Sequence, residues 1–153
     1  MMVLGFRTDP SKPRYALVRK DGAGLVLVNA QGETSLPYPA NIASAAEKTG
    51  WMYREIERIF RDNPDIARVI IKTNEYTQSD SKAKRESAYA EAMLLLYCSQ
   101  HQISVDVKIY GSLATNSGTV KADAEGRVGR TAKYWDAKMA DAVIAAWNWA
   151  RTL

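Results

Sequence analysis

Basic side chains gather in two stretches of the sequence, and groups of this kind can follow the phosphate backbone of a nucleic acid. The first stretch opens an expected helix and the second lies in a segment rich in Gly, Ser and Thr. The residues concerned are Lys82, Lys84, Arg85, Arg127 and Arg130. Acidic residues are interleaved with both stretches, and an ordinary solvated surface is the commoner explanation for such a pattern.

The chain has one cysteine, Cys98, and one histidine, His101. Neither a disulfide framework nor a Cys/His zinc site can be built within one chain from this pair. Any bound metal would therefore have to be a hard ion held by carboxylates. Cys98 lies in an apolar helical turn typical of a protein core, and His101 is better placed to cap a helix than to act as a base.

The composition describes one ordinary folded domain. The 153 residues are 46% hydrophobic and 25% charged, which is enough apolar material for a real core. The net charge of +4 favours an acidic partner such as nucleic acid without requiring one. No apolar run approaches the roughly 18 residues of a membrane span, and the first residues lack signal-peptide features. We expect a cytoplasmic protein with no membrane partner.

Strands and helices can be placed from the hydrophobic pattern. Apolar runs at 2–7, 14–19 and 25–29, separated by turn residues, predict an antiparallel meander. Beyond it the pattern predicts a helix from the Ser44/Glu47 capping box to the DNPD segment, and then a buried strand at 66–72. A helix at about 81–100 with a wide apolar face and a strand at 105–111 follow. The chain ends in a variable loop at about 113–131 and a closing helix at about 132–151. Gly50 is expected to kink or split the first helix.

This order of elements predicts an α/β fold in residues 1–153. Three antiparallel strands joined to alternating helices and strands give a mixed five-stranded sheet, in which a meander adjoins two parallel strands and helices cover both faces.

Two segments carry a resemblance to a known family. LGFRTDPSKPRYALV at 4–18 can be laid without gaps on the pattern L-G-I-D-P-G, a turn and G-Y-x-V-I, so that Gly5 and Tyr15 coincide. DAKMADAVIAAW at 136–147 is similar to a closing helix of the form D-A-A-D-A-L-A-I-A. On these segments the chain resembles the ribonuclease H-like superfamily and, within it, the RuvC-type Holliday-junction resolvases.

The resemblance implies metal-dependent cleavage of phosphodiester bonds. Such enzymes use two magnesium ions held by four carboxylates, at the ends of the first and fourth strands and on the closing helix. Carried over, those positions fall on Arg7, on Lys72 with Glu75 three residues beyond, and on Lys138 and Asp141. Three of the four positions therefore carry a cation.

Such an inversion of charge is incompatible with magnesium. Two unit charges about 4 Å apart interact by about 4 kcal/mol at an effective dielectric constant of 20, and a divalent ion is repelled twice as strongly. If the side chains of Arg7, Lys72, Lys138 and Asp141 converge, they could bind an anion or close on one another as an ion-pair network. They could equally be surface charges that never meet.

Three hypotheses follow from this sequence. The first is a RuvC-like module with a degraded metal site and no cofactor, which binds DNA or RNA, or another partner, without cleavage. The second is an active Mg-dependent endonuclease that uses Asp9, Glu75 and Asp141 and needs a two-residue insertion in the first strand. The third is a protein-interaction scaffold that does not bind nucleic acid. The resemblance also implies a homodimer, although no residue here fixes the oligomeric state.

Overall fold

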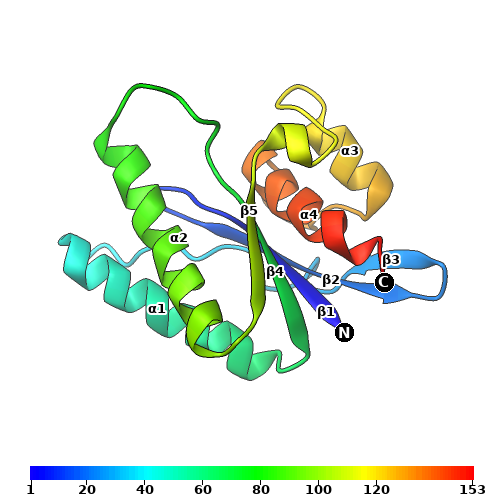
Figure 1. The fold of residues 1–153 in the computed structure, drawn as a ribbon, viewed down its shortest axis with the longest axis horizontal. Coiled ribbons are helices and arrows are strands. Elements are labelled where there is room, and N and C mark those ends of the chain that lie inside the picture. Colours follow the sequence, from blue (N-terminus) through cyan, green and yellow to red (C-terminus); the bar gives the residue numbers. More distant parts are fainter.

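One five-stranded sheet organises the chain, and a computed structural model describes it over residues 1–153. The strands are β1 (Met2–Arg7), β2 (Arg14–Asp21), β3 (Gly24–Leu27), β4 (Ile66–Lys72) and β5 (Ser104–Lys108), in the order β3-β2-β1-β4-β5 (Figure 1). β1, β2 and β3 pair antiparallel, whereas β1, β4 and β5 run parallel. The carboxyl ends of β1, β4 and β5 therefore share one edge of the sheet.

Helices cover both faces of the sheet, as the sequence predicts (Figure 1). The helices are α1 (Ala45–Asp62) and α2 (Lys82–Gln100) on one face, and α3 (Val120–Arg127) and α4 (Ala137–Ala150) on the other; a 3-10 turn, η1, spans Tyr110–Ser112. α1 begins at the predicted capping box, in which Ser44 and Glu47 bond each other's backbone amide groups. None of the helices is both long and apolar enough to cross a bilayer.

Gly5 allows α4 to lie directly on β1. A Cβ atom on Gly5 would be 1.9 Å from the carbonyl oxygen of Ala142 and 2.7 Å from the amide nitrogen of Ala146. Because neither backbone atom can move away cheaply, only glycine fits at this position. The contact fixes the first turns of α4 beside the carboxyl end of β1, where the candidate site lies.

Several elements begin or end at other residues than the sequence predicts. The strand expected at 105–111 ends at Lys108 because the chain turns into η1. Within the variable segment 113–131, the stretch VKADAE, which could form a turn or two of helix, lies in the eight-residue helix α3. The closing helix begins later than expected, after its N-cap residue Asp136. The break expected at Gly50 does not occur, because α1 is continuous over 18 residues.

The apolar face of α2 is narrower than predicted. Leu94 and Tyr97 are buried against the sheet and α1, but Tyr89, Leu95 and Leu96 are 40%, 37% and 44% exposed. The consecutive apolar residues cannot all lie on one side of a helix with 3.6 residues per turn.

Candidate functional site

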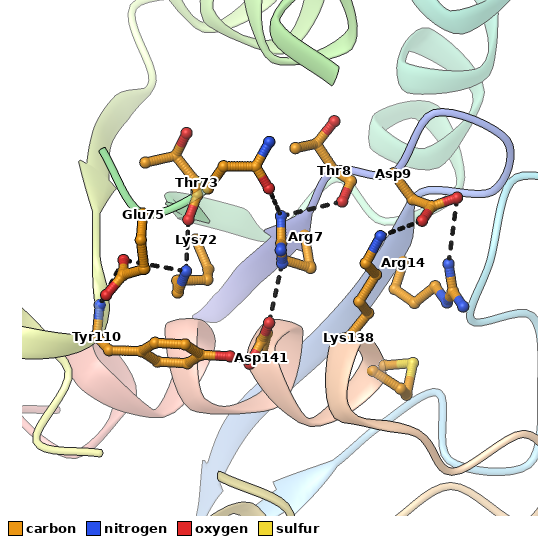
Figure 2. A network of polar contacts seen from close by, with 12 residues as sticks. Arg7, Thr8, Asp9, Arg14, Lys72, Thr73, Glu75, Tyr110, Lys138 and Asp141 are labelled. Atoms are coloured by element: carbon orange, nitrogen blue, oxygen red, sulfur yellow. Dashed lines mark hydrogen bonds and ion pairs between the residues drawn. The ribbon is translucent and has the colours of Figure 1, made fainter. Parts of the chain in front are cut away.

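Three charged side chains from different elements meet where β1 and β4 end. Arg7 is the last residue of β1 and is paired in register with Lys72, the last residue of β4. Asp141 approaches from α4 and accepts a hydrogen bond from Nε of Arg7 onto its Oδ2 atom at 2.9 Å (Figure 2). Arg7 is 9% exposed and Asp141 only 1%, so the pair lies inside the protein.

The other donor groups of Arg7 and Lys72 are also engaged. Nη1 of Arg7 donates to Oδ1 of Asn74 at 2.9 Å and to the carbonyl oxygen of Thr8 at 3.2 Å. Nζ of Lys72 donates to the carbonyl oxygen of Thr73 and lies 3.5 Å from Oε2 of Glu75. Lys72 is 1% exposed, which is exceptional for a lysine.

Tyr110 in η1 completes this group. Its hydroxyl donates to Oδ1 of Asp141 at 2.7 Å, so both oxygens of that carboxylate are occupied. The ring of Tyr110 also lies under the Lys72 ammonium, 4.0 Å from Nζ to the ring centroid. We call Arg7, Lys72, Tyr110 and Asp141 the strand-end network.

Burial perturbs the acid–base properties of the strand-end network. Desolvation and the neighbouring charge of Arg7 lower the pKa of Lys72, while Asp141 and Glu75 act in the opposite direction. Desolvation and the hydrogen bond to Asp141 raise the pKa of Tyr110. Burial also raises the pKa of Asp141, against the hydrogen bonds from Tyr110 and Arg7. Burial thus disfavours the charged forms of Lys72 and Asp141, and the contacts within the network offset only part of that cost.

Lys138 belongs to a second, adjacent ion-pair group (Figure 2). Its Nζ atom pairs with Oδ1 of Asp9, while Oδ2 of Asp9 lies 3.7 Å from Arg14. Arg14 in turn donates to Asp136, the N-cap residue of α4, at 2.7 Å. Lys138 and Asp141 are three residues apart on one side of α4, but Lys138 pairs with Asp9 and Asp141 pairs with Arg7.

The local turn holds Asp9 in its ionised form. Burial of the Asp9 carboxyl opposes ionisation, but bonds from Lys138 and from the backbone amides of Ser11 and Lys12 outweigh it and lower its pKa well below the usual value. Asp9 is thus the anchor of the β1–β2 connection.

Glu91 on α2 is a third buried acid near the edge. Its Oε2 atom accepts a bond from Oγ1 of Thr73 at 3.1 Å, but its Oε1 atom is buried without a hydrogen-bond partner. Burial raises the pKa of this carboxyl despite the positive charges of Arg7 and Lys72. Sequence reasoning missed Glu91, Tyr110 and Arg14, because no local pattern indicates that these side chains turn toward the strand ends.

The acids present do not suit a magnesium pair. No group of three or more Asp, Glu, His or Cys side chains is placed to hold a metal ion. The alternative set of Asp9, Glu75 and Asp141 is not gathered into one group, since each carboxylate faces its own cation: Lys138, Lys72 and Arg7 respectively. A two-metal centre needs several converging carboxylates, which these three acids do not provide.

The two basic stretches lie on opposite faces of the sheet. Lys82, Lys84 and Arg85 open α2, whereas Arg127 and Arg130 are in and after α3 (Figure 1). Arg85 pairs with Asp80 at 2.7 Å, and both arginines of the α3 side face acids at 3.8 Å. Arg127 also stacks on Trp147, with its guanidinium carbon 4.3 Å from the ring centroid. Lys82 is the most open of these groups, with 90% of its side chain exposed.

The sheet order, the mixed strand directions and the helices on both faces define a RuvC-like fold of the ribonuclease H-like class, which confirms the predicted fold. The chain is similar to Thermus thermophilus RuvC in complex with a Holliday junction substrate, with a TM-score of 0.75 and 16% identity over 97% of this chain and 92% of that one. A second structure of Thermus thermophilus RuvC gives a TM-score of 0.74 at the same identity and coverage.

The resemblance extends to a eukaryotic structure. The yeast mitochondrial Holliday junction resolvase Ydc2 matches with a TM-score of 0.65 and 11% identity over 97% of this chain and 77% of that one. No protein-family model matches the sequence, and no curated protein does. At such low identities the likeness establishes the fold.

Proposed function

We propose that this protein is a RuvC-like module that binds nucleic acid without cutting it. One observation carries the proposal: two buried cations, Arg7 paired with Asp141 and Lys72 beside Tyr110, stand at the ends of β1 and β4. These are the positions at which the resemblance to RuvC-type resolvases places metal-binding carboxylates.

The charges in the strand-end network oppose cleavage. The two cations face two carboxylates, Asp141 and Glu75, so no excess of negative charge is left, whereas two divalent ions would require one. Each cation placed about 4 Å from a divalent ion would add roughly 8 kcal/mol of repulsion at an effective dielectric constant of 20. The network is thus a structural replacement for metal ligands.

Nucleic acid would be held by exposed cations around this edge of the sheet. Arg7 and Lys72 are buried, and Nε and Nη1 of Arg7 and Nζ of Lys72 already have acceptors, so they are poor phosphate ligands. The side chain of Lys82 at the start of α2 is 90% exposed, and that of Lys138 is 37% exposed although it pairs with Asp9. Exposed lysines of this kind contact phosphates without reading sequence. The similar RuvC structure that contains a Holliday junction supports nucleic acid as the class of partner.

Binding measured over a series of salt concentrations tests the proposal. We expect fluorescence anisotropy to show binding to a four-way junction or duplex at low salt that weakens as salt rises. Lys82→Glu should weaken binding several-fold. Arg61→Glu is the matched control. Arg61 is 71% exposed in the last turn of α1, which leads to the start of β4 and not to its carboxyl end. Absence of binding at low salt would contradict the proposal, as would Mg- or Mn-dependent cutting that Asp141→Asn abolishes.

A protein-interaction scaffold is the second candidate, and one observation favours it. Leu95 and Leu96 on α2 are exposed, and so is Val107 on the edge strand β5. Exposed apolar side chains close to an outermost strand, whose outer backbone groups can pair with another chain, suit a protein partner. If no nucleic acid binds at low salt, the scaffold becomes the better account.

A further inference from the structure

Tyr134, just before α4, combines an exposed aromatic ring with an unusual backbone conformation. Its side chain is 76% exposed, and its backbone has a φ angle of 55°. That left-handed conformation is unfavourable for a residue with a large side chain, and such outliers gather at binding sites. The surrounding chain imposes it: the amide of Ala132 donates to the carbonyl oxygen of Ala30 at 3.0 Å, and Oγ1 of the buried Thr131 donates to the carbonyl oxygen of Lys133 at 2.8 Å.

A small cavity of about 190 Å³, lined by both polar and apolar groups, opens beside Tyr134. Its walls come from the turn after β3 and from the segment that precedes α4. The lining side chains include Gln31, Thr34, Ser35, Lys133 and Tyr134. Hydroxyl and amide groups are thus available next to an exposed aromatic ring.

One lysine lies over the ring of Tyr134, and a second lines the adjoining cavity. The Nζ atom of Lys12 lies 5.4 Å from the ring centroid, and Lys133 is the preceding residue in the chain. Most lysines and arginines near the candidate site face a carboxylate, but neither Lys12 nor Lys133 takes part in an ion pair. An exposed aromatic ring close to two lysines without carboxylate partners suits a nucleotide, since the base stacks and the phosphates meet the ammonium groups.

Tyr134 also lies at the edge where we place nucleic acid. Lys12 is in the β1–β2 connection, next to the turn that anchors Asp9. Two residues after Tyr134, Asp136 caps α4 and binds Arg14. The ring therefore lies near the turn that holds Asp9, the partner of Lys138.

We propose that Tyr134 stacks on one unpaired base of a nucleic acid, while Lys12 and Lys133 contact the neighbouring phosphates. The inference rests on the proposed function and narrows its substrate class to nucleic acids with single-stranded or unpaired nucleotides. A stacking contact tolerates any base, so it selects for unpaired structure and not for sequence.

The test compares two variants on matched probes. Tyr134→Phe keeps the ring, whereas Tyr134→Gly removes it and accommodates the φ angle of 55°. The probes are a duplex with an unpaired single-stranded gap and the same duplex fully paired, each prepared as DNA and as RNA. We expect Tyr134→Gly to lower affinity for the gapped probe by roughly five- to a hundredfold, with duplex affinity unchanged. Tyr134→Phe should bind both probes as the wild type does.

Thermal unfolding separates this role from a structural one. Tyr134→Gly should unfold at or above the wild-type temperature, because glycine relieves the unfavourable backbone conformation. Unchanged binding of Tyr134→Gly to the gapped probe would overturn the stacking role and leave the proposed function standing. An equal loss on both probes with a lower unfolding temperature would also overturn it. A wild-type protein that binds neither probe at low salt would overturn both proposals.

Discussion

Asp141→Asn tests whether the strand-end network holds together as a set of charges. Asparagine preserves the shape of the side chain and can still accept a hydrogen bond from Arg7 or Tyr110. The substitution removes the negative charge that pairs with Arg7 and leaves Arg7 and Lys72, 9% and 1% exposed, with only the half-exposed Glu75 as a paired carboxylate. Breaking a buried ion pair in this way costs about 3–5 kcal/mol.

Urea denaturation followed by tryptophan fluorescence measures this change in the free energy of unfolding. In a thermal unfolding experiment, a loss of 3–5 kcal/mol lowers the unfolding temperature of a chain of this size by roughly 6–20 °C. Lys72→Met should be nearly neutral or stabilising, because a methionine fills a similar volume without a buried charge. The double variant Asp141→Asn, Lys72→Met should therefore be more stable than Asp141→Asn alone.

A matched substitution on the surface provides the control. Asp106 pairs with Arg68 across β4 and β5, but 44% of its side chain is exposed. Asp106→Asn should therefore cost no more than about 1 kcal/mol. If Asp141→Asn costs no more than Asp106→Asn, or if Lys72→Met gives no rescue, the network is not the buried charge cluster we describe.

Two further predictions concern the elements that hold the site. Because the pKa of Asp9 is lowered from 3.8, its ion pairs stabilise the fold fully above that pH, and the contribution is lost as the pH falls below it. Asp9→Asn should therefore lower stability at neutral pH and make the acid side of a stability–pH curve flatter; a parallel curve would contradict the assignment. Gly5→Ala should cost about 3 kcal/mol or more, since the new Cβ atom would overlap the carbonyl oxygen of Ala142, whereas Gly111→Ala has open space and should be tolerated. Equal unfolding midpoints of these two alanine variants would contradict the close packing of α4 on β1.

Local sequence signals located the central strands of this fold well. β1 and β4 have the predicted bounds, because continuous apolar runs that end in a charge mark buried strands. The end of β5 was misplaced because Tyr110 leaves the strand to bond Asp141, and a contact between distant elements has no local signature.

The candidate site was predicted in part. Alignment with the resolvase motifs brought Arg7, Lys72 and Asp141 together, and the structure places them in one network. Lys138 was expected in the same group but pairs with Asp9, since three residues of helix shift it about 4.5 Å along the axis. Glu91 was missed because only packing of α2 against the sheet brings it near the strand ends.

Binding of Mn²⁺, measured by isothermal titration calorimetry, tests the central claim most directly. We predict no stoichiometric binding by the wild-type protein, because Arg7 and Lys72 stand where metal-binding carboxylates would be needed. The double variant Arg7→Asp, Lys72→Glu should bind Mn²⁺ if circular dichroism shows that it is folded, and lose that binding when Asp141→Asn is added. Stoichiometric Mn²⁺ binding by the wild type that Asp141→Asn abolishes would contradict the account.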